Sequence, residues 1–111
     1  SAPQAPKTSS ADALRHRAAL TYQECREYGT AIAVLEELAS RNPTIAVYRK
    51  DLGVSRYLMG RKEEAKADWK AAIRLDPGLA SAYASLAAAL ESEGRREEAA
   101  AVCSSKPEAC R

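Results

Sequence analysis

The residue pattern of this chain recurs every 34 positions from Asp12 to the end of the sequence. Three registers carry the repeat most clearly: Ala31, Ala65 and Ala99; Leu35, Trp69 and Cys103; and Pro43 and Pro77. A fixed period of this length is typical of arrays of helical units, since one unit cannot bury its apolar face alone and stacks on the next. The repeat therefore restricts the chain to a short stack of similar helical units.

The composition favours helices over sheets and fits one domain. Charged residues make up 29% of the 111 residues, phenylalanine is absent, and glycine and proline number five each. A sheet would need far more Val, Ile and Thr. No apolar run approaches the roughly 20 residues that cross a bilayer. We therefore expect a soluble domain with no direct membrane insertion.

The charge pattern argues against a nucleic-acid partner. The chain has 17 Lys and Arg against 15 Asp and Glu. Basic and acidic residues alternate, as in the segments 61–64 and 95–98. A nucleic-acid binder gathers its Lys and Arg on one face, where they contact phosphates. We find no such stripe and expect no DNA or RNA ligand.

Apolar spacing predicts six helices joined as three hairpins. The expected ranges are 11–26, 31–40, 44–59, 62–75, 79–93 and 95–105. In the first range, Leu14, Ala18 and Tyr22 form one stripe at a spacing of four, and Ser10 is a suitable N-cap. Turn-forming residues separate the ranges, at 28–30, 42–43, 60, 76–78 and 94. Turns this short favour an all-α stack of hairpins.

The chain divides into a tail, a repeat domain and a short C-terminal segment. Residues 1–10 are rich in Pro, Ser and Ala and are predicted to be a flexible tail or linker. The domain is expected over 11–105, with repeats at 12–45, 46–79 and 80–107, followed by a tail at 106–111. The first ten residues lack the pattern of a signal peptide. They fit the remnant of a cleaved signal, a tether to a membrane anchor, or a boundary inside a longer protein.

The repeat resembles the tetratricopeptide repeat (TPR) family. The second unit carries the resemblance best, through Leu52-Gly53, Gly60, Ala65, Trp69, Ala72 and Pro77. The third unit matches at Tyr83, Leu86, Gly94 and Ala99, and the first at Tyr22, Tyr28, Ala31 and Pro43. Three residues depart from the pattern: Arg56 replaces an aromatic residue, Arg26 replaces the turn glycine, and Pro107 shortens the last helix. The resemblance implies a right-handed α-solenoid of three helix-turn-helix hairpins that binds another protein.

The family resemblance also implies that the ligand lies in the concave surface made by the first helix of each hairpin. Aligned by the 34-residue step, Leu20, Val54 and Ala88 form an apolar line in this groove. The full set of predicted groove residues is His16, Arg17, Leu20, Lys50, Val54, Tyr57, Ala88 and Glu91. An exposed apolar line with a polar rim suits a peptide or helix. The alternative is that Leu20 and Val54 are structural residues.

Some members of the family bind a C-terminal carboxylate with Lys, Asn and Arg side chains. The corresponding positions here are His16, Leu20, Asp51, Ser81 and Ser85, none of which matches. Asp51 would repel the ligand, so we do not expect this type of clamp.

The sequence predicts no catalytic site, cofactor or metal. His16, the only histidine, lies nine residues from Cys25 on the same predicted helix. At 3.6 residues per turn the two side chains face opposite sides, which argues against a nucleophile and base pair. The glutamate pairs at 36–37, 63–64 and 97–98 fall on outward faces or early helical turns, where carboxylates are solvated and favoured by the helix dipole. We expect a protein that is not an enzyme.

The C-terminal cysteines raise a structural question. Cys103 shares the register of Leu35 and Trp69 and is a small core residue by default, but Cys110 is close enough for a disulfide. A Cys103–Cys110 bridge would imply an oxidising compartment such as the bacterial periplasm, whereas free thiols would fit the cytoplasm. The last helix has no helix after it to cover its apolar run. An alternative function is therefore a structural module that self-associates as a homodimer or docks through this uncapped helix.

Overall fold

The computed structural model describes residues 8–111 as six α-helices and a final 3₁₀ helix. The elements are α1 (Ser10–Glu24), α2 (Tyr28–Arg41), α3 (Ala46–Leu58), α4 (Lys62–Leu75), α5 (Ala80–Ser92), α6 (Arg96–Ser105) and η1 (Pro107–Cys110). Residues 8–111 contain no strand, so the predicted all-α class is confirmed. Of the predicted N-terminal tail, residues 1–7 lie outside the described residues. Among α1 to α6, none has the length and apolar character of a membrane-spanning helix.

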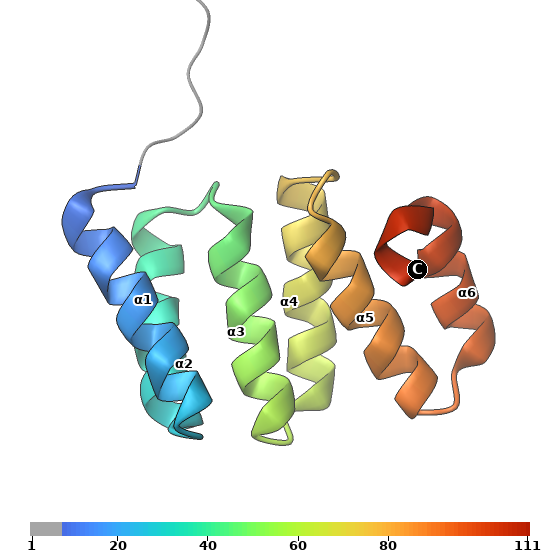
Figure 1. Ribbon diagram of the computed structural model, residues 1–111, viewed down its shortest axis with the longest axis horizontal. Helices are drawn as coiled ribbons and strands as arrows, with labels where there is room; N and C mark the ends of the chain where they lie inside the picture. The colour runs from blue at the N-terminus through green and yellow to red at the C-terminus, as the bar shows by residue number, and fades with distance from the viewer. Residues whose placement is uncertain (1–7) are drawn as a thin grey trace, which may run out of the picture.

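The helices pair as hairpins, and the hairpins stack in chain order. Within hairpins α1 packs on α2, α3 on α4 and α5 on α6; between hairpins α2 packs on α3 and α4 on α5. Figure 1 shows the three hairpins side by side, with α1 at one end of the row and α6 at the other. This arrangement is the predicted solenoid of three hairpins.

Small residues allow the helices of each hairpin to approach closely. Ala31, Ala65 and Ala99, one from each repeat, are all buried. The helices α3 and α4 approach closely at Gly53, where an added Cβ atom would lie 2.5 Å from Nε1 of Trp69. The Trp69 indole N–H donates a hydrogen bond to the carbonyl of Lys50 at 3.0 Å. Close packing of this kind places a large aromatic residue of α4 under the backbone of α3.

The first turn differs from the sequence prediction. We expected residues 28–30 to separate the first two helices, but α1 ends at Glu24 and α2 already begins at Tyr28. The reversal occurs at Arg26, whose φ of 63° is left-handed, like the φ of 95° at Gly60 and 76° at Gly94. Because Arg26 adopts the conformation of a turn glycine, Gly29 is free to join the helix.

The N-cap of α1 is also one residue earlier than predicted. It is Ser9, not Ser10, whose hydroxyl accepts a hydrogen bond from the backbone N–H of Asp12 at 3.1 Å. The cap satisfies one of the amides that the first helical turn leaves without a partner.

Arg56, which replaces the usual aromatic residue, links three helices. Its guanidinium donates two hydrogen bonds to Asp68 of α4, at 3.0 and 2.8 Å, and one to Glu36 of α2, at 3.0 Å. Asp68 is buried and Arg56 partly buried. Both bonds to Asp68 come from Nη1 of Arg56, so this ion pair ties α3 to α4 within the second repeat. The bond to Glu36 links the second repeat to the first.

The chain turns back after α6. Pro107 begins η1, which packs against both α5 and α6. Cys103 and Cys110 are joined by a disulfide, with their Cα atoms 5.7 Å apart. The last helix is therefore partly covered by the segment that follows it.

Candidate partner-binding surface

The predicted groove residues lie on the first helices of the three hairpins, α1, α3 and α5. Arg17, Ala88 and Glu91 are exposed, whereas His16, Leu20, Lys50, Val54 and Tyr57 are partly buried. They are not equivalent in their surroundings. Six of the eight belong to an apolar hollow, a charged cluster or an ion pair, and Arg17 and Leu20 belong to none of these.

The apolar hollow lies between α3 and α5 and has a volume of about 300 Å³. Three predicted residues line it: Val54, Tyr57 and Ala88. The sequence also places Leu58, Ser85 and Ser92 on the groove-facing side of their helices, and all three line the hollow. The sequence did not assign Trp69 and Ala89 to the site. Trp69 was interpreted as core only, and it is buried, but one side of its indole faces this hollow. The small side chains of α5 leave the space open.

Tyr57 is held in a defined position at the edge of this hollow. Its hydroxyl shares a hydrogen bond with the hydroxyl of Ser92 at 2.9 Å. Its ring lies 5.7 Å from the ring of Trp69, and the ammonium group of Lys62 lies 5.6 Å from the ring centre. Contacts on several sides fix the ring, so the hollow is a preformed feature of the fold.

The charged cluster joins α1 to α3 around Asp51. One carboxylate oxygen of Asp51 lies 2.6 Å from His16 Nε2, and the other lies 2.7 Å from Lys50 Nζ. The His16 ring also packs edge-on against Tyr48, with ring centres 5.1 Å apart. Burial alone would raise the pKa of Asp51, but the hydrogen bonds from His16 and Lys50 outweigh it and hold the pKa below its ordinary value. Asp51 is therefore a buried anion that binds both neighbouring side chains.

The other three predicted groove residues, Arg17, Leu20 and Glu91, do not line the hollow. Glu91 faces α6, where its carboxylate lies 3.9 Å from Arg96 Nε. Cys25 is exposed and free. Within residues 8–111, no group of three His, Cys, Asp or Glu side chains is arranged to hold a metal ion.

The comparisons with protein families and with curated proteins both give a match to tetratricopeptide repeats. A family model described as "Tetratricopeptide repeat" matches residues 51–79. A curated relative, small glutamine-rich tetratricopeptide repeat-containing protein 2 of Mycosarcoma maydis, is 34% identical over 74 residues, which cover 67% of this chain and 21% of the relative. The chain thus spans about a fifth of the length of that relative.

Solved structures share the same architecture. A mutant of MamA superposes with a TM-score of 0.75 and 28% identity, covering 94% of this chain and 76% of the other. The Sgt2 TPR domain from Aspergillus fumigatus superposes with a TM-score of 0.84 and 19% identity, covering 97% of this chain and 72% of the other. At 19% identity the second likeness concerns the fold alone.

Proposed function

The chain belongs to the tetratricopeptide repeat family, a family of protein-interaction modules, and we propose that it binds an apolar helical segment of a partner protein in the hollow between α3 and α5. The observation that carries the proposal is the apolar lining of this hollow beside the exposed side chain of Leu58. Apolar residues that stay open to water, framed by polar groups, are typical of surfaces that bind other proteins.

The shape of the hollow supports a helical ligand. The residues that α5 contributes are small, at Ser85, Ala88 and Ser92, and leave room for the backbone of an approaching helix. A ligand helix would direct one or two apolar side chains onto Val54 and Trp69. Full burial of one Leu-sized side chain contributes about 1.5–3 kcal/mol, so two such anchors would suffice for a weak, reversible complex.

The charges around Asp51 support an internal segment as the ligand, in preference to a chain-terminal carboxylate. Lys50 and His16, two basic side chains of the predicted groove, both contact Asp51. A ligand carboxylate would have to compete with a buried anion for them. Arg17 is exposed and is available to contact an acidic residue of the partner outside the hollow.

The intrinsic fluorescence of Trp69, the only tryptophan, gives a direct test. Peptides selected from a display library are titrated into the protein while the Trp69 emission is recorded. Ala88→Glu places a charge at the mouth of the hollow on an exposed helical position, so the fold is retained and affinity falls by about tenfold or more. Ala67→Glu, the same change on an exposed position of α4, is the matched control and should bind as the wild type does.

Two results would refute the proposal. One is a selected peptide that binds without changing the Trp69 emission. The other is equal affinity of Ala88→Glu and Ala67→Glu for every selected peptide, which would place the ligand elsewhere on the array.

A further inference from the structure

The outer face of α1 is the face with which a first helix normally stacks on the preceding hairpin. By the 34-residue register, Leu14 corresponds to Tyr48 and Ala82, and Ala18 to Leu52 and Leu86. All four counterparts are buried, and Tyr48 and Leu52 pack with Leu35 and Leu38 of the hairpin before them. In α1 the same positions are open: Leu14 is 63% exposed, Ala18 is exposed, and Tyr22 nearby is 41% exposed. The helix therefore carries a stacking face with nothing of residues 8–111 on it.

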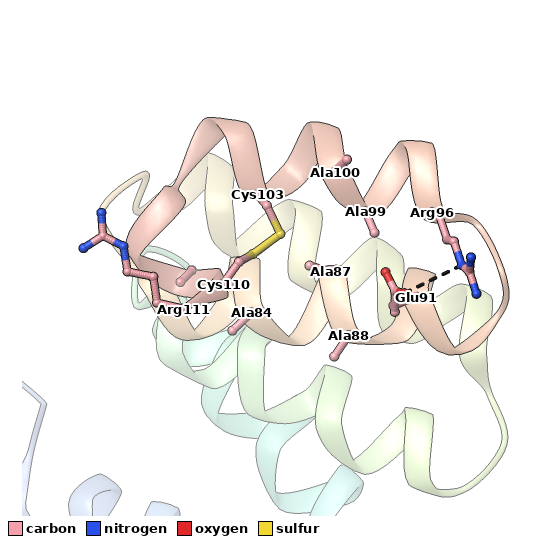
Figure 2. Close-up of a pocket in the computed structure, with 11 residues that line it drawn as sticks. Ala84, Ala87, Ala88, Glu91, Arg96, Ala99, Ala100, Cys103, Cys110 and Arg111 are labelled. Carbon is pink, nitrogen blue, oxygen red and sulfur yellow. Dashed lines mark ion pairs between the residues drawn. A yellow bond between two sulfur atoms is a disulfide. The ribbon is translucent and has the colours of Figure 1, made fainter.

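The other end of the array carries a surface complementary to this face of α1, which we call the seat. A hollow of about 390 Å³ lies along α5 and α6, where a further first helix would stack. Figure 2 shows Ala84, Ala87 and Ala88 on one side of it and Ala99 and Ala100 on the other, with the Glu91–Arg96 pair at one end. By register Ala100 corresponds to Ile32 and Lys66, which contact the next hairpin in their own repeats. The floor of the seat is small where the face of α1 is large, as interlocking helices require.

The disulfide closes the opposite end of this seat. Ala109, Cys110 and Arg111 form its wall there, and the Cys103–Cys110 bond ties them to α6. In Figure 2 the bond crosses the end of the hollow that lies away from Glu91 and Arg96. η1 has only four residues, so it fills only part of the seat. The equivalent positions on the two preceding hairpins are filled by α3 and α5, with 13 residues each. While the bond is intact, a full helix cannot lie along α5 and α6.

We infer that α1 of a second copy of this chain stacks into this seat when the Cys103–Cys110 disulfide is reduced. A thiol reductant supplies the two electrons and is itself oxidised to a disulfide; the S–S bond breaks, and each sulfur takes up one proton. The segment 107–111 then keeps only its backbone connection through Lys106 and can leave the seat. The contact continues the stacking interface that α2 makes with α3 and α4 makes with α5.

This contact joins different faces of the two copies, so a pair of copies still leaves one face of each kind free. Each added copy offers a free α1 at one end and a free seat at the other, which gives an open-ended series. The seat shares Ala88 with the hollow between α3 and α5, but Leu14 and the two cysteines, on which the test relies, do not line that hollow. The inference can therefore hold or fail independently of the proposed peptide site.

The test is sedimentation analysis over a range of protein concentrations, with and without dithiothreitol, in a Cys25→Ser background that excludes bridges through the exposed cysteine. The oxidised protein is expected to stay monomeric. The reduced protein is expected to show an average mass that rises with protein concentration. The double variant Cys103→Ser/Cys110→Ser, which cannot form the disulfide, is expected to do the same with or without dithiothreitol. Leu14→Glu should weaken this association about ten- to hundredfold, the loss expected from one buried Leu side chain. Leu75→Glu, a like change at a position 40% exposed on α4, should not weaken it.

Three outcomes would overturn the inference. A reduced protein that stays monomeric at millimolar concentration has no such interface. Equal association of the oxidised and reduced forms, or of Leu14→Glu and Leu75→Glu, would mean that other surfaces are involved. Loss of helical circular dichroism on reduction and in the double serine variant would also overturn it, because the seat requires a folded α6.

Discussion

Replacing Gly53 with alanine tests the close packing of α3 on Trp69 of α4. The new Cβ atom would lie 2.5 Å from Nε1 and 2.8 Å from Cδ1 of Trp69. Both are rigid ring atoms, so a bond rotation at the tip of a side chain cannot relieve the contact. The indole must move as a whole, and its 3.0 Å hydrogen bond to the carbonyl of Lys50 is then lengthened or lost.

Two opposing effects decide the size of the change. Alanine favours a helix over glycine by about 1 kcal/mol. Overpacking of a close-packed interior costs about 1–3 kcal/mol, and loss of the hydrogen bond costs about 0.5–1.5 kcal/mol. The steric effect wins, and we expect the free energy of unfolding to fall by about 1–3 kcal/mol.

Urea unfolding followed by circular dichroism measures this change, and Gly29→Ala is the matched control. Gly29 also lies in a helix, but a Cβ atom there would meet only Cε of Met59 at 3.6 Å, an ordinary contact. The control should therefore keep the helix-propensity gain and be more stable than the wild type by up to about 1 kcal/mol. A Gly53→Ala variant as stable as the wild type would refute the packing account.

Two further changes test single residues. Arg26→Gly should raise the free energy of unfolding by up to about 1 kcal/mol in the same urea assay. Glycine adopts the φ of 63° without the cost of about 1–2 kcal/mol that other residues incur, and the entropy cost of glycine offsets part of this gain. A less stable variant would contradict this. Asp51→Asn should flatten the loss of stability in acid. Although burial alone would raise it, hydrogen bonds hold the folded pKa of Asp51 below its ordinary value of 3.8, so its contribution to stability is present above that pH and is lost as the pH falls through the folded pKa. Unfolding measured from about pH 6 to about pH 2 checks this, and an unchanged slope in the variant would contradict it.

The fold could be predicted from the sequence because its determinants are local and repeated. The alanines at 31, 65 and 99 recur at one register, and all three are buried as the close helix packing requires. For the first turn, the local signals favoured residues 28–30, although the register aligns the turn glycines Gly60 and Gly94 with Arg26. Its residue type disfavours the left-handed conformation that it adopts, and the nearby Gly29 offered a better turn signal although it lies inside α2.

The candidate site was less accessible to sequence reasoning, because it depends on contacts between residues far apart in the chain. The register identifies the helices and positions that face the groove. It does not show that His16 and Lys50 meet at the same carboxylate, which requires the relative rotation of α1 and α3. Nor does it show that the indole of Trp69, a core residue by register, lines a hollow between α3 and α5.

The register of Leu35, Trp69 and Cys103 has a different role in the third unit from that in the first two, and the difference follows from what lies next to it. Leu35 and Trp69 are buried because a following hairpin covers them. In the third unit no residue up to Arg111 forms such a hairpin, and a large apolar side chain at position 103 would face water. Cysteine is small enough to leave little apolar surface there, and its bond to Cys110 brings η1 over the position that a helix would cover. The same side chain thus ends the stack while it is oxidised and, under the inference above, permits the stack to continue once it is reduced.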